Sequence, residues 1–118
     1  MADNEVEVVE YVNTSGKNVF ALWMAKLDTK AFTKVTAAIA RMRNGNMGDV
    51  KYVGEGVSER RIDFGPGYRI YFGKEGPQLV ILLGGGTKSQ QNKDIHAAQE
   101  AWIEYKQRKR RTKPNGTD

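Results

Sequence analysis

Apolar residues recur along this chain at two spacings, every second position in some segments and every third or fourth in others. Val6, Val8 and Val9 alternate roughly with glutamates, which predicts a first strand over residues 5–12. The polar stretch "NTSGKN" interrupts this pattern, as turn-forming residues do between elements. A strand followed by a break is therefore expected at the start.

Two amphipathic helices are predicted next. Phe20, Trp23 and Leu27 have the spacing of residues on one helical face. A second helix is expected over residues 30–43, and its apolar stripe consists of Phe32, Val35, Ile39 and Met42. Because the link between the helices is short, we expect them to pack as an antiparallel pair.

Three strands are predicted after the helices. The segments "VKYVGEGVSERRIDF", "YRIYFGKE" and "QLVILLGG" are separated by turns at Gly65-Pro66-Gly67 and Gly76-Pro77. Such short connections predict an antiparallel meander. The last segment is apolar at consecutive positions, which predicts a strand in the middle of the sheet.

A C-terminal helix completes the pattern, and its apolar face consists of Ile95, Ala98, Trp102 and Tyr105. The predicted order β-α-α-β-β-β-α indicates an α+β fold. In this fold the N-terminal helical pair packs on one face of a twisted antiparallel sheet. We expect a single domain over residues 1–105 and a basic, flexible tail over residues 106–118.

The amino-acid composition indicates the net charge of the chain and the compartment in which we expect it. Basic residues exceed acidic ones by five (19 − 14), a surplus that favours polyanionic partners. The absence of cysteine excludes a disulfide framework, a thiolate metal site and a thiol nucleophile. The acidic N-terminus lacks the pattern of a secretory signal, and the longest apolar run, "LVILL", is too short to cross a bilayer. We therefore expect a soluble, cytoplasmic protein without a membrane partner.

Charged side chains concentrate on the hairpin "RRIDFGPGYRIYF". Strand alternation puts Arg61, Arg69 and Tyr71 on the face that the helical pair leaves free, if the apolar residues between them pack on the helices. Arg60 then falls on the apolar side, where its stem is expected to reach the sheet edge. Lys88 follows "GGG" near the end of the next strand.

Two interpretations remain open for these charges. They are solvated surface groups, with Arg61 paired to Glu59 or Asp63, or they form an anion-binding site. The basic run "KQRKRRTK", residues 106–113, is likewise either a solvated tail or a contact for nucleic-acid phosphates. His96 is the only histidine, so it has no second histidine or cysteine with which to form a metal site.

Two long segments carry a resemblance to a known family. The stretch "GNMGDVKYVGEGVSERRIDFGPGYRIYF", followed by "LVILLGGGTKSQQNKDI", resembles the RelE/ParE toxin superfamily, in particular HigB-like addiction-module killer proteins. The similarity covers about residues 6–105 in the same order of elements. It implies a RelE-like fold and the toxin half of a type II toxin–antitoxin pair. The implied partner is a cognate antitoxin, commonly a helix-turn-helix protein from the adjacent gene.

The resemblance also implies an activity. RelE-type relatives cleave mRNA, typically on the ribosome, so the expected protein is an endoribonuclease that inhibits translation. In this reaction the 2′-hydroxyl attacks the adjacent phosphate, and one product carries a cyclic phosphate. The chemistry requires a base, an acid for the leaving 5′-oxygen and cations for the phosphorane charge. It implies no metal and no other cofactor.

Roles for single residues follow from the same resemblance. Arg69 would stabilise the pentavalent phosphorus, Arg61 would hold the scissile phosphate, and Lys88 would lie near the leaving group. His96 matches a histidine that takes part in HigB-type relatives, and Glu59 is a candidate base. The implied RNA-binding residues are Lys51, Arg60 and Tyr71.

The chain also departs from its relatives. Arg60 stands where many members have leucine, and the final helix does not show the tyrosine that some RelE-type enzymes use. The rival function is that of a ParE-like toxin, which inhibits DNA gyrase without being an enzyme and shares the fold. A third alternative is an inert binding module. The basic, histidine-bearing site favours the nuclease.

Overall fold

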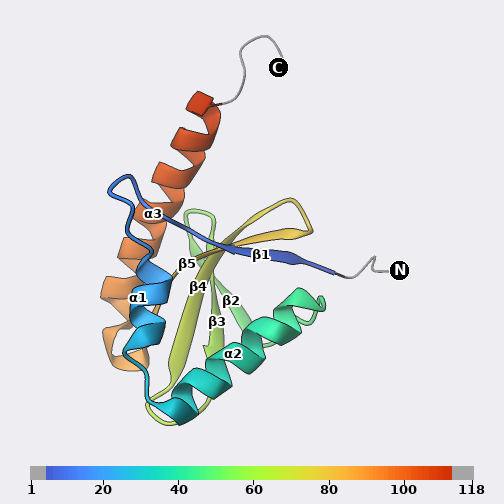
Figure 1. Cartoon of the computed structure of the whole chain (residues 1–118), viewed down its shortest axis with the longest axis vertical. Coiled ribbons are helices and arrows are strands. Elements are labelled where there is room, and N and C mark those ends of the chain that lie inside the picture. The colour runs from blue at the N-terminus through green and yellow to red at the C-terminus, as the bar shows by residue number, and fades with distance from the viewer. Residues whose placement is uncertain (1–4, 113–118) are drawn as a thin grey trace.

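The structure, a computed structural model, describes residues 5–112 of the chain, which form five strands, three α-helices and one 3₁₀ turn. The elements are β1 (Glu7–Glu10), α1 (Val19–Ala25), α2 (Thr29–Arg43), β2 (Val50–Gly54), β3 (Val57–Ile62), β4 (Tyr68–Glu75), β5 (Leu79–Thr87), the 3₁₀ turn η1 (Lys88–Gln90) and α3 (Gln91–Thr112). The predicted α+β class is confirmed. Figure 1 shows the helices arranged around one twisted sheet.

The sheet has five strands in the order β1-β5-β4-β3-β2. From β2 to β5 neighbouring strands are antiparallel, as the short turns predicted. However, β1 pairs with β5 in parallel, so the expectation of a wholly antiparallel sheet is wrong. The apolar strand β5 lies between β1 and β4, which confirms the position predicted for it.

The segment from residue 50 to residue 64, expected to be one strand, is a hairpin made of β2 and β3. Glu55 and Gly56 both adopt positive φ, at 54° and 83°. Two consecutive residues of this kind form the tight turn that suits the twist of a hairpin. The backbone N–H of Gly56 donates to the Tyr52 hydroxyl at 3.0 Å and closes the turn.

Side-chain caps fix the starts of the helical pair. The Asn18 side chain accepts a hydrogen bond from the backbone N–H of Ala21 at 2.9 Å, and Asp28 accepts one from Ala31 at 2.9 Å. Each cap satisfies a backbone donor that a helix terminus otherwise leaves without a partner. The two helices therefore begin at defined points and present their apolar sides to the sheet.

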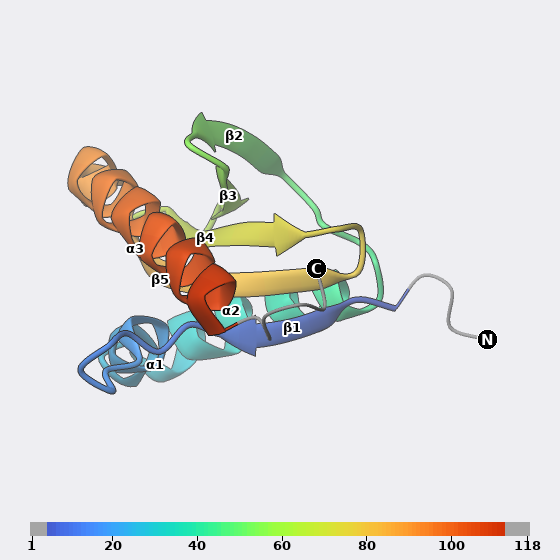
Figure 2. The same ribbon diagram turned by 90° about the horizontal axis from the view of Figure 1, so that it is seen from above.

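Each face of the sheet carries its own core. On one face α1 and α2 pack against strand residues of β3, β4 and β5, among them Ile62, Ile70, Phe72, Val80 and Leu82. On the other face α3 packs Ala98 and Trp102 against Val57, Ile81 and Leu83. Figure 2 shows α3 on one side of the sheet and the helical pair on the other.

The last helix is longer than predicted. A flexible tail was expected from residue 106, but α3 continues as a helix to Thr112. Residues 113–118, which complete the predicted tail, lie outside the described residues. Within residues 5–112, no helix has both the length and the apolar character that crossing a bilayer requires.

Two tyrosines anchor the C-terminal half of α3. The Tyr11 hydroxyl donates to Glu104 at 2.6 Å, and the Arg108 guanidinium also donates to Glu104. The Tyr105 hydroxyl donates to Glu75 of β4 at 2.8 Å. Burial and the bonded Glu104 carboxylate raise the pKa of Tyr11 to about 12.

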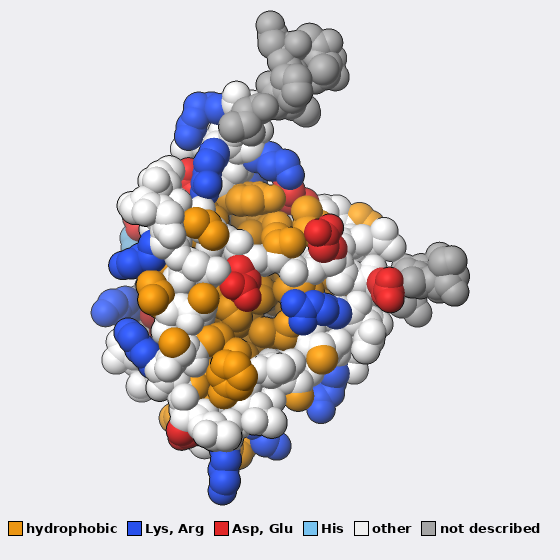
Figure 3. Space-filling view, in the orientation of Figure 1, with side chains coloured by type: hydrophobic (Ala, Val, Ile, Leu, Met, Phe, Trp, Pro, Cys, Tyr) orange, Lys and Arg blue, Asp and Glu red, His pale blue; other side chains and the backbone are white. Residues whose placement is uncertain are grey.

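The helical pair does not seal its own face. Figure 3 shows hydrophobic side chains gathered in a hollow on the side of the molecule that carries α1, α2 and β1. The lining includes Phe20, Met24, Phe32, Ile39 and Leu82. This hollow lies on the face opposite to α3.

Candidate functional site

Two rows of side chains cross the sheet on the α3 face. In the first row Arg61 of β3 lies directly opposite Arg69 of β4, which lies opposite Gly86 of β5. In the second row Lys51 of β2 lies opposite Glu59, and Glu59 lies opposite Tyr71. Directly opposed residues project from the same face of a sheet. The prediction that Arg61, Arg69 and Tyr71 share a face is therefore confirmed.

That face is not open, as the sequence had led us to expect. Helix α3 crosses it, and Glu59 and Tyr71 have no exposed surface. Arg69 is 9% exposed. The predicted contact between Tyr71 and RNA does not fit this conformation, because the phenol packs in the core beneath α3.

Arg61 lies at the accessible end of its row. Its Nη2 donates to Asp49 Oδ1 at 3.0 Å, so its partner is neither Glu59 nor Asp63. The Arg61 side chain is still 36% exposed. The hydrogen bond from Arg61 lowers the pKa of the Asp49 carboxyl. A solvent-exposed pair of this kind is weak, so an incoming phosphate can compete for the guanidinium.

Several buried donors in the two rows lack a partner among the described residues. The Nε atoms of Arg61 and Arg69 and the Tyr71 hydroxyl are buried, and none makes a hydrogen bond within residues 5–112. Burial, followed by the charges of Glu59 and Asp94, raises the pKa of Tyr71. Unsatisfied buried donors are uncommon, and they often mark a place where a ligand or an ordered water completes the bonding.

Glu59 is the buried anion of this region. Gln91, the first residue of α3, donates through Nε2 to both carboxylate oxygens of Glu59, at 2.9 and 3.0 Å. The charge is therefore satisfied by the start of α3. Without exposed surface, Glu59 cannot reach a 2′-hydroxyl in this conformation, which argues against its expected role as a base.

Asp94 belongs to the site, although sequence reasoning missed it. Its carboxylate lies directly over Gly86, so close that a Cβ on Gly86 would overlap it. Burial raises the pKa of Asp94, while the charge of Lys93 lowers it. The signal was available in the sequence, because Asp94 precedes Ala98 by four residues and so shares the inward face of the helix.

Lys88 and Lys51 are exposed cations at the margins of the two rows. The backbone N–H of Lys88 donates to Gly67 O at 2.8 Å and ties the end of β5 to the Gly65-Pro66-Gly67 turn. The Lys88 side chain is exposed next to that turn. Lys51 is exposed on the edge strand β2, beside Glu59.

Two predicted site residues lie away from the first row, which we call the arginine row because it contains Arg61 and Arg69. His96 is 73% exposed on the outer side of α3, where Nε2 lies 3.2 Å from Glu100. Arg60 lies on the helical-pair face, as alternation predicted, and its guanidinium packs against Gly48. Its Nη1 donates to Arg61 O at 2.7 Å, and burial lowers its pKa. The structure therefore gives Arg60 no place beside Arg69.

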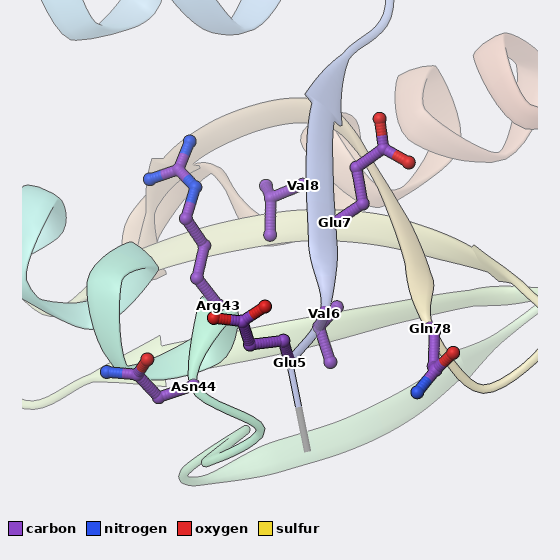
Figure 4. A pocket seen from close by; sticks show the side chains of 7 residues that line it. All are labelled: Glu5, Val6, Glu7, Val8, Arg43, Asn44 and Gln78. Carbon is purple, nitrogen blue, oxygen red and sulfur yellow. The ribbon is translucent and has the colours of Figure 1, made fainter. Parts of the chain in front are cut away.

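Hollows also occur away from the two rows of side chains. One of about 690 Å³ lies along the start of β1 and the end of α2. Figure 4 shows its lining, which consists of Glu5, Val6, Glu7, Val8, Arg43, Asn44 and Gln78. Among residues 5–112, no three His, Cys, Asp or Glu side chains are grouped as a metal ion requires.

Fold and site together define an α+β domain with a cationic row partly covered by its C-terminal helix. The chain is 49% identical over 80 residues to an uncharacterized protein of Haemophilus influenzae, a match that covers 67% of this chain and 81% of that protein. This chain belongs to the same family as that protein. No protein-family model and no solved structure matches the chain.

Proposed function

We propose that this chain is the toxin of a type II toxin–antitoxin pair, with a RelE-like fold, and that it cleaves mRNA without a metal. The observation that carries the proposal is the cross-strand pair of Arg61 and Arg69. Two guanidinium groups on neighbouring strands suit the bidentate recognition of a phosphodiester. Lys88, two residues beyond Gly86, adds an exposed cation at the same end of the sheet.

The proposed reaction is an in-line transesterification. A base takes the proton of the 2′-hydroxyl, the O2′–P bond forms, and the P–O5′ bond breaks as the leaving oxygen receives a proton. Arg69, which keeps 9% exposure, would direct its guanidinium toward the negative charge that develops on the phosphorane. Asp94, whose pKa burial raises, is suited to carry one of the two protons, and we give His96 no role.

Binding extends beyond the scissile phosphate in this proposal. Lys51 would contact the RNA backbone from the edge strand, and the exposed basic residues at the end of α3 would add further phosphate contacts. The partner would be an antitoxin, commonly a helix-turn-helix protein, whose gene is adjacent. The protein would act in the cytoplasm, on transcripts bound to the ribosome.

Primer extension on transcripts after induction tests this proposal. We expect new 5′ ends in the RNA when the chain is expressed alone, and none when the adjacent gene is co-expressed. Purified chain with synthetic RNA would then show whether the ribosome is required. Intact transcripts in cells that stop growing would contradict the proposal.

The rival candidate is a ParE-like inhibitor of DNA gyrase. The burial of Arg69 favours it, because an inhibitor does not need accessible cations on this face. Plasmid supercoiling measured in the same induced cells distinguishes the two functions. Relaxed or cleaved plasmid with intact transcripts would support the rival, and normal growth would indicate an inert module.

A further inference from the structure

The start of α3 is attached to the sheet through Gln91 and Glu59. Gln91 Nε2 donates to both oxygens of the Glu59 carboxylate, at 2.9 and 3.0 Å. Gln91 directly follows the turn η1, which begins at Lys88, and stands one helical turn before Asp94. The pair therefore lies at the junction between these two residues.

The hydrogen bonds between Gln91 and Glu59 are expected to hold both side chains in place. A carboxylate without exposed surface is costly unless donors satisfy it, and Gln91 supplies such donors to both oxygens. The neighbouring Tyr71 hydroxyl makes no hydrogen bond within residues 5–112, so it does not share this task. Removing Gln91 would leave the Glu59 charge buried without this support.

The other end of α3 is attached independently. Trp102 lies in the core of the α3 face, and Tyr105 and Tyr11 bind Glu75 and Glu104. Loss of the Gln91 contact is thus expected to loosen the first turns of α3 while the rest of the helix stays docked. Local opening of this kind is common where few apolar contacts hold a segment.

We propose that Glu59 and Gln91 are positioning residues, which fix the start of α3 and so hold Lys88 and Asp94 beside Arg61 and Arg69. Glu59 then acts through the helix and not on the substrate. This inference rests on the proposed RNA cleavage for its kinetic consequence, but not for its structural one. Displacement of reacting groups by about 1 Å costs on the order of a hundredfold in rate.

A swap of the two side chains tests the inference. Gln91→Glu removes the donor and sets two carboxylates against each other, and Glu59→Gln removes the buried charge. The double variant restores an N–H to carboxylate hydrogen bond in the reverse direction. We expect Gln91→Glu to lower kcat roughly tenfold to a hundredfold with a much smaller change in KM. We expect the double variant to recover most of that rate.

The swap separates positioning from direct catalysis. If the folded double variant stays as inactive as Glu59→Gln alone, the Glu59 carboxylate itself takes part in the reaction and the inference is wrong. Thermal unfolding of each variant identifies any that fail to fold. A variant at position 59 alone could not make this distinction, because both roles would be lost together.

Amide hydrogen exchange of residues 88–94 gives a second measurement that needs no activity. Gln91→Glu should exchange faster in this segment, the double variant should return toward the original rate, and residues 100–108 should be unaffected. Unchanged exchange in Gln91→Glu would overturn the inference. If the unaltered chain cleaves no RNA, the proposed function fails, and the exchange pattern still decides the role of the pair.

Discussion

The two faces of the sheet are covered by helices of different number and chemistry. Helices α1 and α2 cover one face with apolar side chains, and Arg60 is the buried charge among the strand residues there. A single helix covers the other face, with an apolar contact around Trp102 and a polar contact around Gln91. The face covered by α3 therefore combines an apolar half that stabilises the fold with a polar half whose burial costs free energy.

The difference indicates where stability and function lie. Apolar packing on both faces supplies the free energy of folding, at roughly 25 cal/mol for each Å² of apolar surface removed from water. The polar half buries the Glu59 carboxylate, and it buries Arg69 Nε and the Tyr71 hydroxyl without a hydrogen bond partner within residues 5–112, at a cost of about 1–3 kcal/mol for each of these two donors. Such a cost is expected where charge serves binding or catalysis.

Trp102→Ala should have the largest effect, and on stability. The indole lies against Gly73 and Gly56, where a Cβ on either glycine would overlap the ring, and it stacks on Tyr105. We expect the free energy of unfolding to fall by about 3–5 kcal/mol, measured by chemical denaturation. Ile103→Ala, at the exposed next position, should change it by less than about 0.5 kcal/mol. Equal losses would mean that α3 is not docked through Trp102.

Arg69→Ala should have the next largest effect, on RNA cleavage. Loss of a donor to the phosphorane should lower kcat on the order of a hundredfold or more, measured on purified chain with RNA. Arg60→Leu is the matched control, since Arg60 lies on the opposite face, and it should leave cleavage intact. Full activity in folded Arg69→Ala, or equal losses in both variants, would show that the arginine row has no specific role in RNA cleavage.

Much of this comparison could be predicted from local patterns. Alternation correctly put Arg61 and Arg69 on one face and Arg60 on the other, because side-chain direction in a strand is set by the backbone. The apolar stripes likewise identified the helix faces. The hairpin at Glu55 and Gly56 was missed, because a continuous run of β-forming residues concealed a two-residue turn.

Contacts between segments far apart in the sequence could not be predicted from local patterns. The parallel pairing of β1 with β5 depends on which edge the first strand joins, and alternation carries no information on this. The burial of Tyr71 depends on where α3 crosses the sheet. The Glu59–Gln91 bond joins residues 32 apart, and only the assembled fold brings them together.

Tyr71→Phe should have a small effect on stability, and the effect should be neutral or stabilising. Its hydroxyl is buried without a hydrogen bond partner within residues 5–112, so its removal should leave stability unchanged or raise it by up to about 1 kcal/mol. Tyr11→Phe is the matched control, because that hydroxyl donates to Glu104 at 2.6 Å. The control should lose about 0.5–1.5 kcal/mol in thermal unfolding. A similar loss in both variants would show that Tyr71 has a partner, such as an ordered water.

Asp94→Asn should have the smallest effect, and one that depends on pH. Burial raises the pKa of Asp94 in the folded chain, so folding favours the neutral carboxyl. This contribution is fully present below the unfolded pKa, about 3.9, and is lost as the pH rises through the higher folded value. Asparagine has no such dependence, so the variant should be the more stable protein at pH 7, with the difference shrinking toward pH 3.5.

Thermal unfolding of both chains across this pH range isolates the Asp94 contribution, because every other carboxyl group is common to the two. A variant that is less stable at pH 7 would contradict the sign. Greater stability together with slower RNA cleavage would mean that the carboxylate is retained at the expense of stability because it transfers a proton. Greater stability with unchanged cleavage would assign that proton to another group.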